Sequence, residues 1–169
     1  MVKGLIAFEN ARLLFKNFSG KEGKYNREGD RNFCVVIPDD EAVSRMEKDG
    51  WNIRWTKPKE GSEYEPVPYI QVKVSYKKSE PTVVLIAEEN GEPISKKELG
   101  EDDINVLDYT YITNVPKIVI SPYNYEVGGK TGVTAYLRKL YVSFEVDPLE
   151  MKYKDVPDSA MTSFERFYD

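Results

Sequence analysis

The chain has 169 residues and a formal net charge of −5, from 29 aspartates and glutamates against 24 lysines and arginines. This length fits one domain with a substantial core, and a hydrophobic fraction of 40% argues against a disordered chain. The sequence contains no histidine, which excludes histidine-dependent catalytic triads and the commonest zinc and iron sites.

Short apolar segments rich in β-branched and aromatic residues predict a mainly β domain. The first, Leu5–Phe18, is interrupted by Asn10, Arg12 and Lys16, so it fits neither a bilayer span nor a secretion signal. The pattern predicts further strands at Asn32–Ile37, Trp51–Trp55, Tyr69–Tyr76, Thr82–Ala87, Ile118–Ile120 and Thr134–Val146. Seven short strands with turns between them indicate a barrel or a sandwich, two architectures that the pattern does not separate.

A polar loop with several glycines, residues 19–31, follows the first predicted strand. It is longer than a hairpin requires, and long loops of this kind are often functional. From Arg12 to Arg31 the net charge is +3. The loop itself gathers basic side chains around a tyrosine: Lys21, Lys24, Tyr25, Arg27 and Arg31. We expect it to bind a ligand, and an ordinary solvated loop is the alternative.

The second predicted strand holds the single cysteine of the sequence, Cys34. Its neighbours are apolar and no histidine exists to activate it, so we expect an inert, buried thiol. One cysteine cannot form an internal disulfide, which is typical of reducing compartments. We therefore expect a cytoplasmic protein.

Two segments favour helices. Pro38-Asp39-Asp40-Glu41 places acidic residues in a first turn, and Gly50 is a suitable stop. Ser95-Lys96-Lys97-Glu98 has the form of a capping box, and a short helix is expected to continue at Ile104–Leu107. Between these segments, Trp51 and Trp55 share one face of a predicted strand, and we expect both in the core.

Alternation in the fourth predicted strand separates a core face from a polar face. One face holds Ile70, Val72, Val74 and Tyr76, and Tyr69 and Lys73 share the other. Tyrosine is favoured in strands, so about half of the 12 tyrosines are expected to be structural. Tyr69 beside a lysine is instead a candidate for ligand binding.

The stretch from Glu88 to Asp108 is acidic, with eight carboxylates against Lys96 and Lys97. The carboxylate runs at residues 39–41 and 101–103 suit helix starts and lack the spacing of a calcium loop, so we expect no metal site. No cofactor or catalytic residue is expected either, and the protein is predicted not to be an enzyme.

Gly128-Gly129 predicts a β-hairpin turn. The segment ending in Lys130-Thr131 superficially resembles a phosphate-binding loop, but Asn124 replaces its first glycine and a strand follows where that motif needs a helix. In the hairpin, Lys130 is expected beside Tyr123 and Tyr125. From Lys117 to Tyr141 the net charge is +3.

Basic residues interleaved with aromatic ones are what a single strand of nucleic acid requires. Phosphates need cations, and exposed bases need flat surfaces on which to stack. No signature of a duplex reader is present. The candidate stacking residues are Tyr25, Tyr69, Tyr123, Tyr125 and Tyr136. The candidate phosphate contacts are Lys21, Lys24, Arg27, Arg31, Lys73, Lys130 and Arg138.

Several short motifs, in order over residues 5–146, resemble those of single-stranded DNA-binding proteins of tailed bacteriophages. They are Asn17–Lys21, Asn26–Phe33, Asp49–Trp51, Ser121–Tyr125 and Gly129–Leu137. The resemblance implies an OB-fold-like Greek-key barrel, here residues 1–154, that binds single-stranded DNA with little sequence preference in DNA replication and recombination. It would act in the host cell cytoplasm, without a membrane, and self-association is left open.

The resemblance also implies an acidic, aromatic C-terminal tail, here residues 155–169, that contacts replication or recombination proteins. The candidate residues are Phe164, Phe167, Tyr168 and Asp169. The tail carries few carboxylates, and Arg166 interrupts them. Two other functions stay open: a phage module that inhibits a host nuclease or defence protein through the acidic stretch, and a virion or assembly protein.

Overall fold

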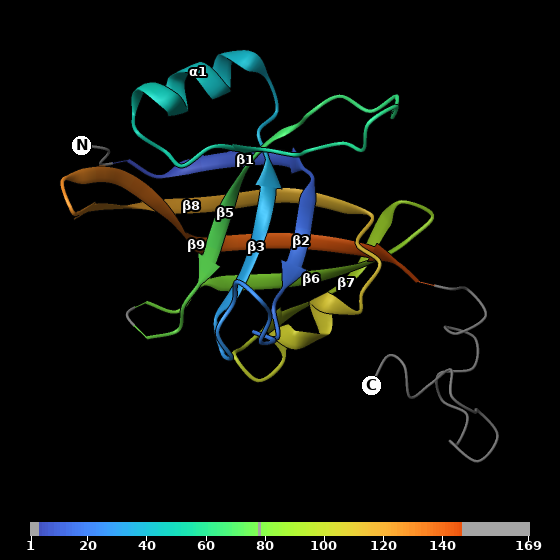
Figure 1. Ribbon diagram of the computed structural model, residues 1–169. Coiled ribbons are helices and arrows are strands. Elements are labelled where there is room, and N and C mark those ends of the chain that lie inside the picture. The colour runs from blue at the N-terminus through green and yellow to red at the C-terminus, as the bar shows by residue number, and fades with distance from the viewer. Residues whose placement is uncertain (1–3, 78, 147–169) are drawn as a thin grey trace.

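The computed structural model describes residues 4–77 and 79–146, and Figure 1 shows their arrangement. In chain order the elements are β1 (Ile6–Ala11), β2 (Leu13–Asn17), β3 (Arg31–Val36), α1 (Asp40–Lys48), β4 (Arg54–Trp55), β5 (Pro68–Val74), β6 (Thr82–Glu89), β7 (Glu92–Leu99), the 3-10 helix η1 (Ile104–Asp108), β8 (Asn114–Val127) and β9 (Lys130–Glu145). None of the helices in these two ranges is long and apolar enough to cross a membrane. The mainly β prediction is confirmed.

The strands close into a barrel because β1 and β2, which lie at the two ends of the sheet order, follow each other directly in the chain. The order is β1-β8-β9-β5-β3-β2, and Arg12 alone separates β1 from β2 in the chain. β5 and β9 pair in parallel, whereas the other neighbours in this order are antiparallel. This is the Greek-key arrangement of an OB-like fold, so the barrel, and not the sandwich, is the architecture.

The predicted alternation along β5 holds in the structure. Ile70, Val72 and Val74 are buried in the core, and Lys73 is exposed on the opposite face. Inside the barrel Phe18 and Phe33 stack with their ring centroids 5.0 Å apart, and both are fully buried. The inner faces of the strands supply the core, and Lys73 projects from the outer face of β5 into solvent.

Helix α1 covers one end of the barrel, as Figure 1 shows. The Asp39 side chain accepts a hydrogen bond of 2.8 Å from the Ala42 amide, which satisfies one of the free amides at the helix start. The buried residues of the helix are Ala42, Val43 and Met46. The predicted helix, begun by this acidic cap, is confirmed.

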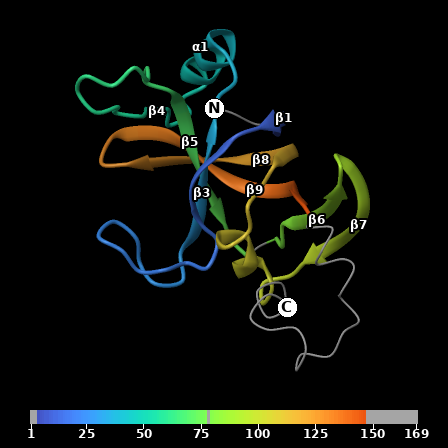
Figure 2. The same cartoon turned by 90° about the vertical axis from the view of Figure 1, so that its right-hand side faces the viewer.

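The helix predicted at Ser95-Lys96-Lys97-Glu98 is wrong, because these residues lie in β7. β6 and β7 form a hairpin whose turn is Asn90-Gly91, with φ of 52° and 81°. Positive φ at both residues fits the type I′ turn that joins strands tightly, and Asn-Gly is its favoured sequence. β6 also pairs in parallel with the second half of β9. In Figure 2 this hairpin and the loop after β2 project to opposite sides of the barrel.

The two tryptophans differ in environment. Trp51 is 4% exposed and bridges to Val133, which confirms the core prediction for this residue. Trp55 is 46% exposed, so the core prediction for it is wrong. The reason is that residues 51–53 do not form a regular strand, and β4 covers only Arg54 and Trp55, where both side chains are exposed.

Candidate nucleic-acid interface

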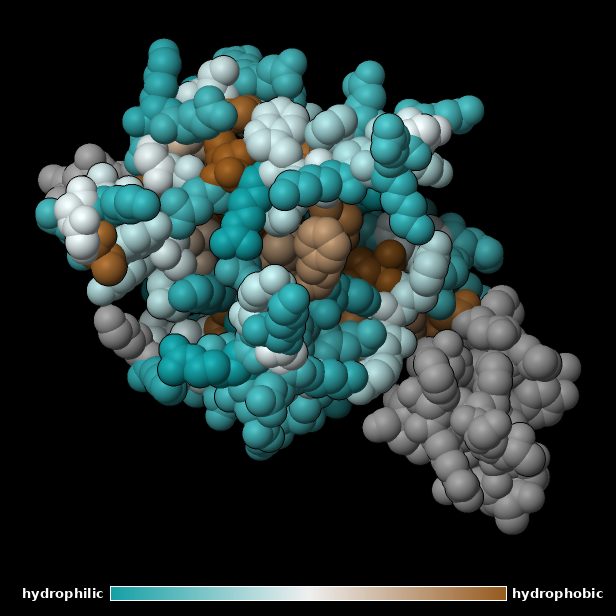
Figure 3. All heavy atoms as spheres, in the orientation of Figure 1, coloured by the Kyte–Doolittle hydropathy of each residue, from teal (hydrophilic) through white to brown (hydrophobic). Residues whose placement is uncertain are grey.

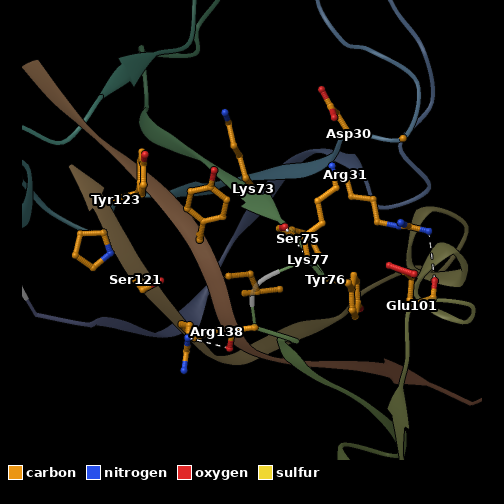
Figure 4. A pocket seen from close by; sticks show the side chains of 16 residues that line it. Asp30, Arg31, Lys73, Ser75, Tyr76, Lys77, Glu101, Ser121, Tyr123 and Arg138 are labelled. Atoms are coloured by element: carbon orange, nitrogen blue, oxygen red, sulfur yellow. Dashed lines mark hydrogen bonds between the residues drawn. The ribbon is translucent and has the colours of Figure 1, made fainter. Parts of the chain in front are cut away.

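A groove of about 600 Å³ opens where the end of β5 lies beside the β8–β9 hairpin. We call it the hairpin groove. Its walls are residues 29–31, 73–77, 79, 101, 121–123 and 136–138. Figure 4 shows Tyr123 on one side, Arg31, Tyr76 and Glu101 on the opposite side, and Lys73 between them. Five of the twelve predicted binding residues meet in this groove: Arg31, Lys73, Tyr123, Tyr136 and Arg138.

One wall of the groove is an aromatic pair next to a lysine. Lys73 on β5 lies in register with Tyr136 on β9, so both side chains leave the same outer face. The ring of Tyr136 meets that of Tyr123 edge to face, with centroids 6.0 Å apart. Tyr123 is 50% exposed. A half-exposed tyrosine pair beside a cation offers a stacking surface and a phosphate contact together.

The groove carries four cationic side chains against the two carboxylates of Asp30 and Glu101. They are Arg31, Lys73, Lys77 and Arg138. The Arg138 guanidinium donates to the Ser79 hydroxyl at 3.1 Å, which fixes its direction. The balance of charge in the groove is therefore positive, although the chain as a whole is acidic.

Arg31 is oriented by the segment around η1. Its Nη2 donates to the carbonyl of Glu101 at 3.3 Å and to Oδ1 of Asn105 at 3.5 Å, and its guanidinium lies 6.0 Å from the Tyr76 ring centre. Within the described ranges, Arg31 Nε and the Tyr76 hydroxyl are buried without a hydrogen-bond partner. Burial also raises the pKa of the Tyr76 hydroxyl, which keeps it a donor.

The two unsatisfied donors, Arg31 Nε and the Tyr76 hydroxyl, lie in one wall of the groove and are closed to solvent. Buried polar groups almost always have a partner, and leaving a donor unsatisfied costs about 1–3 kcal/mol. A guanidinium binds phosphate through charge and through its accessible N–H groups. Because both atoms are shielded from solvent, a phosphate in the groove would meet the positive charge of the Arg31 guanidinium and not these two donors.

The loop after β2 borders the groove through Gly29 and Asp30. Gly20 at its base has φ of 68°, and a Cβ there would lie 2.8 Å from the backbone of Gly29, so only glycine fits. At its centre the Asn26 amide donates to three carbonyls, those of Lys21, Arg27 and Asp30. The loop is therefore held in a defined shape at the mouth of the groove.

The four other predicted residues of this loop lie outside the groove itself. Lys24 Nζ is 5.4 Å from the centre of the Tyr25 ring, which is 92% exposed. Lys21 Nζ lies 5.0 Å from the Tyr109 ring, and a hydrogen bond to Tyr109 raises the pKa of this lysine. Arg27 pairs with Asp30 at 3.9 Å. None of these four side chains lines the groove, which the loop borders through Gly29 and Asp30.

A family model described as "Putative phage ssDNA-binding domain" matches residues 3–165. The chain belongs to this family. The resemblance noted from the sequence motifs is thereby confirmed. No curated protein matches the chain.

Solved structures of a single-stranded DNA-binding protein from bacteriophage Enc34 are similar to this phage family member. One contains single-stranded DNA and has 16% identity, covering 86% of this chain and 89% of that chain with a TM-score of 0.48. Another has 15% identity, covering 98% and 90%, with a TM-score of 0.47. A C-terminal truncation has 16% identity, covering 86% and 88%, with a TM-score of 0.47.

Three predicted residues of this phage domain lie away from the hairpin groove. Tyr69 is at the start of β5 and meets the ring of Phe15. The hydroxyl of Tyr125 accepts a hydrogen bond of 3.0 Å from the Asn52 amide. Lys130 is exposed at the start of β9, beside the hairpin turn. Tyr125 and Lys130 therefore belong to the hairpin and not to the groove wall.

The predicted tail residues Phe164, Phe167, Tyr168 and Asp169 lie outside the described residues, as does the division at residue 154. Within the described part, the sequence reasoning missed Tyr76, Lys77 and Ser79 as groove residues. Tyr76 was placed on the core face by alternation. The cluster of basic and hydroxyl side chains directly after the strand is the sequence signal that could have identified them.

Proposed function

We propose that this protein binds single-stranded DNA with little sequence preference and serves phage DNA replication and recombination. The observation that carries the proposal is the hairpin groove, where the Tyr123–Tyr136 pair lies beside Lys73 and is faced by Arg31. Bases would stack on the tyrosines, and phosphates would meet the cations. Membership in the phage family supports this assignment.

The proposal involves binding alone. The groove offers stacking surfaces and donors, and neither kind of contact breaks a bond. The basic side chains Lys21, Lys24 and Arg27 would add contacts at the groove mouth, and Lys130 at the hairpin tip. The C-terminal residues Phe164, Phe167, Tyr168 and Asp169 would contact replication or recombination proteins, an assignment that rests on the family resemblance.

The test is a titration of labelled oligo-dT of about 16 nucleotides by fluorescence anisotropy, at salt concentrations of about 50 and 200 mM. We expect affinity to fall steeply with salt, because each neutralised phosphate contributes a slope of about −0.7 in log K against log salt. Lys73→Ala should weaken binding and make the slope shallower by about 0.7. A duplex of the same length should bind more weakly.

The matched control is Lys97→Ala, which removes an exposed lysine from β7 that lies outside the groove walls. It should leave both affinity and slope unchanged. Absence of binding at the lower salt, or equal behaviour of the two lysine variants, would contradict the proposal.

A further inference from the structure

A second and wider groove lies at the other end of β5. It measures about 1020 Å³, and we call it the β2–β5 groove. Its aromatic and basic walls are Arg12, Phe15, Trp55, Lys57, Tyr64 and Tyr69. Lys59 adds a third cation, and Glu60 and Glu65 are the carboxylates of its loop side. Figure 3 shows hydrophobic side chains in the middle of this face, ringed by hydrophilic ones.

The aromatic side chains of this groove are unusually open to solvent. Phe15 is 63% exposed, Trp55 46% and Tyr64 83%. Phe15 and Tyr69 meet edge to face, with ring centroids 5.5 Å apart. Aromatic rings gathered from separate segments and left uncovered in this way mark a binding surface.

The backbone presents Phe15 outward at a cost. Its φ is 51°, a left-handed conformation that is a true outlier for a bulky residue. The pairing of β2 with β3 shifts register between Leu14 and Asn17, around this residue. Such irregularities re-aim side chains and concentrate at functional sites. The strain at Phe15 therefore points to a use for its exposed ring.

The two grooves share one continuous outer face. Tyr69, Gln71 and Lys73 alternate with the core residues of β5, so all three side chains leave the same side. Lys73 and Tyr69 are separated by about 13 Å along the strand. Between them lies a small hollow with a mixed lining. Its polar residues are Asn52, Arg54, Gln71 and Thr134, and its apolar ones are Trp51, Ile70, Val133 and Ala135. The outer face of β5 and this hollow thus join the two grooves.

We propose that a single strand of DNA held in the hairpin groove continues along β5 into the β2–β5 groove. There its bases stack on Phe15, Trp55 and Tyr69, and its phosphates meet Arg12 and the lysines of the loop after β4. This inference rests on the proposed function, since it extends the same strand. The continuity of the face along β5 favours DNA over a protein partner or a second copy as the occupant.

The first test is intrinsic tryptophan emission during titration with oligo-dT of about 16 nucleotides. Trp51 is buried but lines the small hollow, and Trp55 is half-exposed. The part of the emission change that is lost in Trp55→Phe, which keeps Trp51, therefore reports on Trp55 and thus on this groove. We expect quenching that saturates together with the anisotropy signal. Emission that stays constant while anisotropy rises would overturn the inference.

The second test compares affinities of variants. Trp55→Ala and Phe15→Ala should each weaken binding by roughly five- to a hundred-fold, the range expected for one stacked base. Tyr111→Ala is the matched control, because Tyr111 is 86% exposed but lines neither groove. It should bind as the unchanged protein does. Circular dichroism checks that each variant is folded, and Trp55→Phe should retain most of the affinity.

The outcomes separate this inference from the proposed function. If the protein binds oligo-dT and Lys73→Ala weakens binding, but Trp55→Ala and Phe15→Ala behave like Tyr111→Ala, the second groove does not hold DNA and the first still does. A dimer in sedimentation that Trp55→Ala dissociates would assign the groove to a second copy and also overturn the inference. Failure of every variant and of the unchanged protein to bind would defeat the proposed function itself.

Discussion

Cys34 shows how strongly the barrel wall shields a single side chain. It lies on β3 and is 5% exposed, and burial raises the pKa of its thiol to about 11. The thiolate is the reactive form, so the thiol is inert at neutral pH. The expectation of a buried cysteine is confirmed, and its reactivity can be measured.

Native protein at pH 8 should therefore react with iodoacetamide far more slowly than protein unfolded in urea. The raised pKa also fixes the sign of a pH effect. The unfolded thiol loses its proton first, so the contribution of Cys34 to stability falls as pH rises from about 9 toward 11. Cys34→Ala should abolish labelling in both states, and equal labelling rates in the native and unfolded protein would contradict the prediction.

At the scale of single residues, the sequence supported predictions that depend on one strand alone. The alternation that put Tyr69 and Lys73 on one face needs no knowledge of the neighbouring strands. The meeting of Arg31 with Tyr76 depends on the ends of two strands and on η1, which are far apart in the sequence. Trp55 was mispredicted because strand alternation was assumed where the backbone has none.

Among the elements, η1 does most to position the basic loop. The Asp108 carboxylate accepts hydrogen bonds from the amides of Phe18 and Ser19, at 2.7 and 2.9 Å, and from the Ser19 hydroxyl. Nearby, Lys16 donates to the carbonyls of Leu107 and Thr110, and burial lowers the pKa of this lysine. The end of β2 and the residues directly after it are thus hydrogen-bonded to η1 and to Thr110.

Asp108→Ala should lower the free energy of unfolding by about 1–3 kcal/mol, because it leaves the Phe18 and Ser19 amides without their acceptor. Urea denaturation followed by circular dichroism measures the change. Asp102→Ala removes an exposed carboxylate from the same segment and should have little effect. Equal midpoints for the two variants would show that the Asp108 contacts contribute nothing to stability.

Whether an element could be predicted depended on how local its signal is. The cap at Asp39 and the glycine pair at 128–129 act within a few residues, and both the helix and the hairpin are confirmed. The wrong prediction of a helix at Ser95-Lys96-Lys97-Glu98 could have been avoided from the local sequence. Asn90-Gly91 is a strong hairpin signal, and it outweighs the capping-box pattern. A pattern of four residues is weaker evidence than a turn that joins two strands.

For the whole molecule, β9 is the strand on which the barrel depends. It pairs with β8 along most of its length, with β5 near its start and with β6 near its end. Closure also requires β1 to pair with β8, more than 100 residues away in the chain. Pairings over such distances leave no local pattern, which explains why the sequence did not separate a barrel from a sandwich.

Hydrogen exchange should show that the strands differ in how well their amides are protected. Amides of β9 around Leu140, which has a strand on each side, should exchange slowest. Amides of β7 should exchange much faster than those of β9, because β7 pairs with β6 alone and is exposed from Glu92 to Glu98. Mass spectrometry of peptides from the two strands measures this, and equal protection would contradict the ranking.

Among the neighbouring strands of the barrel order, β5 and β9 share the shortest stretch of pairing. Its register consists of Val72 with Ala135 and Lys73 with Tyr136, whereas β8 and β9 pair from Asn114 to Val127. The hairpin groove lies over this short pairing, and Lys73 and Tyr136 also line the groove. A strand of DNA bound in this groove, as proposed, would contact both β5 and β9 and so stabilise their pairing. DNA binding and closure of the barrel would then favour each other.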